Sequence, residues 1–160
     1  MRLRHQVRYD APPEEVYAML SDPGFRQKSC DAQGVLSADV TIEPTADGMT
    51  VQIDQVQPMQ GVPAFARKIA GESTRAVQTE EWSDHSRATL TIRTPGKPTE
   101  ITGTLRLEGD GSGTVETFDG EVKAKVPLIG GKLESLMADL FTAGMDAENQ
   151  VGRAWLEGGR

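Results

Sequence analysis

Two histidines, His5 and His85, are the first residues to consider for acid–base chemistry. His5 falls on the apolar face of a predicted strand, where a neutral imidazole could orient the polar end of a ligand or relay a proton. A core histidine hydrogen-bonded to backbone explains the same placement. His85 lies in a Ser-Asp-His-Ser turn and is expected to be solvated. Since the two are far apart in sequence and have no cysteine partner, we predict no metal site and no cofactor.

Cys30 is the only cysteine. Lys28 would lower the pKa of its thiol, but Asp31 would raise it, and no histidine is near in sequence. We therefore predict an inert thiol rather than a nucleophile. A lone thiol also forms no intramolecular disulfide, so nothing in the sequence requires an oxidising compartment.

Gly130-Gly131-Lys132 stands just before a predicted helix and raises the question of phosphate binding. Val126 occupies the position of the first glycine of a phosphate-binding loop, and Leu133 occupies that of its Ser or Thr. A tight turn into the helix explains the glycines better, although anion capture at the helix N-terminus stays open. No catalytic residue is predicted.

The composition excludes several classes of partner. A net charge of −7 repels phosphate backbones, so no nucleic-acid partner is expected. No segment approaches the ~18 apolar residues of a membrane span, so stable membrane insertion is not expected. The first residues lack the apolar run of a signal peptide, which favours a cytoplasmic location. Aromatic residues make up only 5% of the chain, which leaves a core of aliphatic side chains and Met that fills space less completely.

The elements that must position these residues follow from patterning. Alternation over residues 2–9 predicts a strand, and two short helices open at the prolines that follow Ala11 and Asp22. A strand meander follows, with a hairpin turn at Asp47-Gly48. Within it, Pro58–Gly71 has the period of a short amphipathic helix, which either covers a cavity or crosses the sheet.

A final helix is predicted over Leu128–Leu156, with apolar residues at spacings of three and four and a length of about 40 Å. Tight turns between the strands favour an antiparallel sheet. We therefore predict one α+β domain over residues 1–160, in which the sheet packs on the long helix.

Two segments resemble a known superfamily. Val7–Tyr17 (VRYDAPPEEVY) resembles the opening of START-like domains, also called SRPBCC or birch-allergen-like. Gly120–Glu134 (GEVKAKVPLIGGKLE) resembles the signature of an actinobacterial family of unknown function within that superfamily. The resemblance implies the helix-grip fold, with a curved antiparallel sheet of about seven strands around the C-terminal helix and two short helices after the first strand. It also implies a cavity for small apolar molecules, and no catalytic residue.

Binding of a hydrophobic small molecule, such as a lipid, an isoprenoid or a polyketide-like compound, is the function we predict from these features. The cavity would lie between the sheet and the terminal helix. Tyr9, Thr79 and Thr117 could add polar contacts. The predicted ligand-binding residues are His5, Val7, Ile53, Leu90, Leu105, Met137, Leu140 and Met145.

Two alternatives stay open. A cyclase or aromatase could use the same cavity, but it needs an acid–base pair, and His5 is the only inward titrating group that the patterning indicates. A protein-interaction module without a ligand could instead use Pro58–Gly71 and the exposed end of the long helix. Neither the identity of the ligand nor the oligomeric state follows from the sequence.

Overall fold

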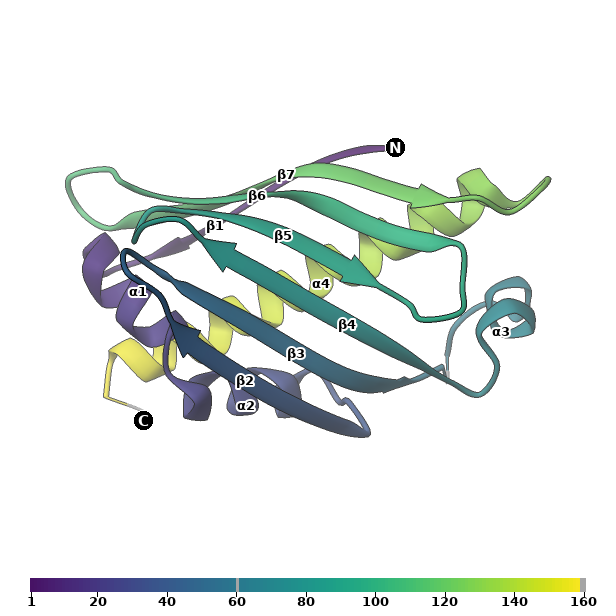
Figure 1. The fold of residues 1–160 in the computed structure, drawn as a ribbon, viewed down its shortest axis with the longest axis horizontal. Helices are drawn as coiled ribbons and strands as arrows, with labels where there is room; N and C mark the ends of the chain where they lie inside the picture. Colours follow the sequence, from purple (N-terminus) through teal and green to yellow (C-terminus); the bar gives the residue numbers. More distant parts are fainter. Residues whose placement is uncertain (60, 159–160) are drawn as a thin grey trace.

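The computed structural model describes residues 1–59 and 61–158 as a curved sheet with one long helix across its concave side (Figure 1). The elements are β1 (Arg2–Tyr9), α1 (Pro13–Leu20), α2 (Pro23–Ala32), β2 (Ser37–Pro44), β3 (Met49–Pro58), α3 (Ala64–Ala70), β4 (Ser73–Trp82), β5 (Arg87–Arg93), β6 (Thr99–Gly109), β7 (Thr114–Ala124) and α4 (Gly130–Leu156).

The sheet has seven strands in the order β1-β7-β6-β5-β4-β3-β2, and every pair is antiparallel. The predicted fold class, α+β with the helix-grip arrangement, is thereby confirmed. The first and last strands pair as expected, and on their outer faces Arg2 forms an ion pair with Asp119 at 2.8 Å.

Glycines permit the close approaches within the sheet. At the β2–β3 turn, a Cβ on Gly48 would lie only 2.0 Å from the carbonyl oxygen of Trp82, so no other residue fits. Gly103 and Gly120 face each other on β6 and β7, and the ring of Phe118 lies against both. That ring also meets Phe141 of α4 at a centroid distance of 4.6 Å, which joins the sheet to the helix.

The two short helices begin as the sequence indicates. Pro13 opens α1, and the Asp22 side chain caps α2 by accepting a hydrogen bond from the backbone N–H of Gly24 at 2.8 Å. Phe25 of α2 packs edge-on against Trp155 near the end of α4, with 5.6 Å between ring centroids. These contacts hold the first helices against the terminal one.

The long helix α4 begins at Gly130, two residues after the predicted start at Leu128. It packs mainly against α2, β1 and β7 and stands farther from β3, β4 and β5. Space is therefore left between the middle of the sheet and the helix. At one end of that space, α3 packs on the start of α4 through a small apolar cluster of Ala66, Ala124 and Leu133. None of the described helices is both long and apolar enough to cross a membrane.

Candidate functional site

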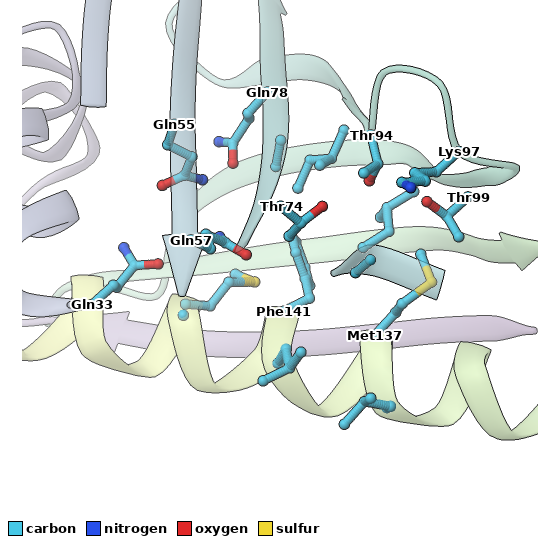
Figure 2. A pocket seen from close by; sticks show the side chains of 18 of the residues that line it. Gln33, Gln55, Gln57, Thr74, Gln78, Thr94, Lys97, Thr99, Met137 and Phe141 are labelled. Carbon is cyan, nitrogen blue, oxygen red and sulfur yellow. The ribbon is translucent and has the colours of Figure 1, made fainter. Parts of the chain in front are cut away.

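A cavity of about 210 Å³ lies between the concave face of the sheet and α4 (Figure 2). Its walls come from β3 to β7, from α3 and from α4, and most of the surface is aliphatic. The larger apolar residues that line it include Met59, Ile69, Leu90, Ile92, Ile101, Leu105, Leu133, Leu136, Met137, Phe141 and Met145. The helix α3 closes part of one end through Ala66, Ile69 and Ala70.

Five of the eight residues predicted to bind ligand lie on this wall: Leu90, Leu105, Met137, Leu140 and Met145. Leu140 differs from expectation in one respect. A leucine in the apolar stripe of the terminal helix should be buried, but Leu140 is 49% exposed, although it lines the cavity. The reason is that α4 stands away from the central strands there, so the side chain has no sheet residue to pack against.

His5, Val7 and Ile53 are not among the described lining residues. Val7 and Ile53 are packed in the core. His5 instead places Nε2 2.7 Å from Oδ1 of Asp146, on the flank of α4. This position follows from β1, which packs directly against α4 and leaves no space between them.

The three residues predicted to add polar contacts to the ligand do not line the cavity either. Tyr9 is buried in the core, and Thr79 and Thr117 are likewise absent from the described cavity wall. Thr117 lies on the outer face of β7, where its hydroxyl accepts a hydrogen bond from Gln6. Thr79 precedes inward-facing Glu80 on β4 and therefore points outward.

A buried polar network occupies the deep end of the cavity. Arg26 of α2 donates to both carboxylate oxygens of Glu80 on β4, at 2.8 and 2.9 Å, and to the carbonyl of Leu20 at 2.8 Å. Gln78 and Trp82 also donate to Glu80, at 2.6 and 2.9 Å. Burial disfavours the ionised form of Glu80, but the charge of Arg26 and these hydrogen bonds outweigh it and lower the pKa.

Glu148 of α4 extends the network across the cavity. It accepts a hydrogen bond from the Ser29 hydroxyl at 3.1 Å, and it lies 3.9 Å from the Arg26 guanidinium. Its side chain keeps 20% of its surface exposed because it faces the cavity. Burial nevertheless raises its pKa, since the attraction of Arg26 only partly compensates for lost hydration.

Glu116 of β7 differs from the other two acids because its carboxyl has no hydrogen-bond donor in the described part of the chain. It lines the cavity and is 3% exposed, and no described residue donates a hydrogen bond to it. Burial, together with the charges of Glu148 and Glu80, raises its pKa to about 8. At neutral pH its carboxyl is therefore protonated and can donate a hydrogen bond or a proton into the cavity.

Amides and hydroxyls complete the polar part of the wall. Gln55 is buried, and its Oε1 has no hydrogen-bond partner among the described residues. Figure 2 shows Gln33, Gln55, Gln57 and Gln78 gathered on one side of the pocket, with Thr94, Lys97 and Thr99 on the other. The apolar middle therefore has polar groups at both ends.

Patterning could have revealed part of this network. Glu116 stands two residues before inward-facing Phe118, and Glu80 stands two before inward-facing Trp82, so strand parity places both carboxyls on the concave face. Glu148 follows Gly144 by four residues and is in phase with the apolar stripe of α4. Arg26 carries no comparable signal, because its partners are remote in sequence.

Metal binding and thiol reactivity are the two remaining kinds of chemistry. Within residues 1–59 and 61–158, no group of three or more His, Cys, Asp or Glu side chains is arranged to hold a metal ion. The Cys30 thiol is buried in the core. Burial, with a further contribution from the charge of Glu148, raises the pKa of this thiol to about 11.

Three solved structures illustrate the fold that this chain shares with other proteins. TTHA0849 from Thermus thermophilus is 21% identical, with a TM-score of 0.67 over 98% of this chain and 99% of that one. The di-domain ARO/CYC StfQ from the steffimycin biosynthetic pathway is 12% identical, with a TM-score of 0.64 over 98% of this chain and 50% of that one. The Zhui aromatase/cyclase from Streptomyces sp. R1128 is 14% identical, with a TM-score of 0.51 over 94% and 95%.

At these identities the structures show a shared fold, and that fold agrees with the START-like resemblance. A search of curated proteins found no match. The model of one protein family matches residues 4–156, almost the whole chain. That the family is actinobacterial stays a prediction. The chain therefore belongs to the family described as "Protein of unknown function (DUF2505)".

Proposed function

We propose that this protein binds a hydrophobic small molecule, such as a lipid, an isoprenoid or a polyketide-like compound, between its sheet and α4. The observation that carries the proposal is the 210 Å³ cavity, with an aliphatic middle and a few polar groups at its ends. Ligand sites are mostly apolar, with a small number of placed polar groups. An apolar cavity of about 150 Å³ already takes up benzene, so a compact ligand of one or two rings or a short branched chain fits here.

The packing of α4 supports the same proposal. Leu136, Met137, Phe141 and Met145 line the cavity and remain only partly buried, although they belong to the apolar stripe of the helix. Such side chains lack partner atoms on one side and lose dispersion contacts. A hydrophobic guest would restore those contacts.

Native mass spectrometry of the purified protein tests the proposal, followed by solvent extraction of any bound molecule. We expect a co-purifying apolar compound, and micromolar binding of a naphthalene-type fluorescent probe by protein from which it has been removed. Met137→Trp fills the cavity and should abolish probe binding, whereas Ala143→Trp, on the exposed side of the same helix, should not. A stable dimer that binds no ligand would favour an interaction module instead.

A cyclase or aromatase is the second candidate, and Glu116 is the observation that favours it. Patterning of the sequence indicates only His5 as an inward titrating group, which is not an acid–base pair. Glu116 and Glu148 both line the cavity, and burial raises the pKa of each. Such a pair could protonate a carbonyl and accept a proton from a neighbouring carbon. Mass analysis of a short polyketone incubated with the wild type and with Glu116→Gln tests this candidate: loss of water should require Glu116.

A further inference from the structure

The carboxyl group of Glu116 has no hydrogen-bond partner among the described residues, so a ligand in the cavity can use it as a donor when it is protonated. The Oε1 atom of Gln55 also lacks a partner, but it can only accept a hydrogen bond. The neighbouring charged groups are already engaged: Glu80 accepts from Arg26, Gln78 and Trp82, and Arg26 is held by Glu80 and the Leu20 carbonyl. Glu116, in contrast, lines the cavity from β7 and receives no hydrogen bond from a described residue. Because its carboxyl reaches the cavity and its side chain is only 3% exposed, a ligand in the cavity can supply the missing hydrogen bond.

The charges around Glu116 determine whether a charged or an uncharged ligand group can bind next to its carboxyl. Glu148 faces it from α4, Glu80 from β4 and Arg26 from α2, so the surroundings hold two further acids and one cation. Tyr9 of β1 is also close enough for its ionisation to be affected by Glu116. Arg26 is paired with Glu80, and Lys97 lies on the opposite side of the cavity, so a ligand carboxylate placed beside Glu116 would meet no free cation among the residues that the structure describes. It would be buried beside acids, which is strongly unfavourable.

We propose that the ligand is an uncharged apolar molecule with a carbonyl oxygen, and that this oxygen accepts a hydrogen bond from the Glu116 carboxyl. The proposal rests on the proposed function, because it specifies the chemistry of the same cavity. An uncharged oxygen satisfies the donor without bringing a second charge into the site. Burial and the nearby acids keep Glu116 protonated at neutral pH, as the hydrogen bond requires.

Three naphthalenes of nearly equal shape separate the possibilities: 2-acetylnaphthalene, 2-isopropenylnaphthalene and 2-naphthoate. They share the ring system and differ in whether the substituent is a ketone, an alkene or a carboxylate. Calorimetric titration of the ligand-free wild type at about pH 6, two units below the pKa of Glu116, should show the ketone binding about tenfold more tightly than the alkene. The carboxylate should bind more weakly than either.

Ketone affinity should fall as pH rises through about 8, while alkene affinity stays constant.

Variants at Glu116 test whether this residue is responsible. Glu116→Leu should reduce the ketone to the affinity of the alkene, and removal of a buried acid should not impair folding. Glu116→Gln retains a donor, so it should preserve the ketone preference and abolish its pH dependence. Gln57→Leu changes another polar lining residue, on β3, and should leave the preference intact.

The outcomes also separate this proposal from the function on which it rests. Equal binding of ketone and alkene, or tightest binding of the carboxylate, would overturn the proposal and leave apolar binding standing. A ketone preference that survives in Glu116→Leu would overturn it as well. If none of the three naphthalenes binds, the cavity is not a ligand site of this size, and both proposals fail together.

Discussion

The guanidinium of Arg26 and the carboxylate of Glu80 meet in a two-point ion pair, with N–O distances of 2.8 and 2.9 Å and side chains 2% exposed. The pair joins α2 to β4 across the base of the cavity, and the residues are 54 positions apart in the chain. Because the Glu80 oxygens accept four hydrogen bonds in all, the carboxylate is fully engaged in holding this end of the fold. It is therefore a structural group, in contrast to Glu116.

Removing one partner of this pair should destabilise the protein strongly. Arg26→Met leaves Glu80 buried without its cation, so we expect the free energy of unfolding to fall by about 3–5 kcal/mol, measured by denaturant titration. The double variant Arg26→Met/Glu80→Leu removes both charges and should recover most of that loss. A single variant with unchanged stability would show that water or another cation replaces the guanidinium.

The order of elements was predictable because each depends on local rules. Alternation in β1 and β7, the Asp-Gly turn before β3 and the prolines of α1 and α2 act within a few residues. The apolar part of the cavity was partly predictable for the same reason: Leu90, Leu105, Met137 and Met145 follow strand parity or helical phase. Leu140 also lines the cavity, but its exposure depends on how far α4 stands from β4 and β5, which no local pattern encodes.

The polar end of the cavity needed more than local rules. Strand parity and helical phase place Glu116 and Glu148 on the inner faces of β7 and α4, but charged side chains are almost never fully buried, so the local pattern alone does not predict that they lie in the cavity wall. Arg26 is near both carboxyls, and burial raises the pKa of both, which lessens the cost of placing them in the cavity wall. Only the packed structure brings α2, β4, β7 and α4 to one place.

Two leucines of α4 should respond very differently to the same substitution. Leu133 is 6% exposed in the cluster beneath α3, whereas Leu140 is 49% exposed. Leu133→Asp buries an unpaired charge and should lower the free energy of unfolding by about 3 kcal/mol or more. Leu140→Asp should change it by less than about 1 kcal/mol, as exposed sites usually do. Chemical denaturation of both variants measures the difference, and equal losses would contradict the placement of Leu140 at the cavity edge.

Cys30 should be unreactive in the folded protein. Its thiol is buried, and a pKa of about 11 leaves almost no thiolate at neutral pH. Treatment with a thiol-specific reagent at about pH 7.5 should label the native protein at least a hundredfold more slowly than the denatured protein, a ratio set by the thiolate fraction and burial. Cys30→Ser serves as the blank. Rapid native labelling would mean that α2 opens readily or that the thiol is accessible.

The stability of the protein should depend on Glu116 in a direction that its pKa defines. Its pKa is about 8 in the folded state and about 4.5 in the unfolded chain, so between these values the folded state holds a proton that the unfolded state has released. Its contribution to stability is therefore fully present below about pH 4.5, and it is lost as pH rises to about 8, at up to about 1.4 kcal/mol per pH unit. Glu116→Gln removes this titration, so its stability relative to the wild type should increase steadily from about pH 5 to pH 8. Denaturant titrations at several pH values measure the difference, in which groups that titrate independently of Glu116 cancel; Glu148 contributes to it because the two carboxyls interact. A difference that stays constant across this range would show that Glu116 ionises normally and has more access to water or to a cation than its burial indicates.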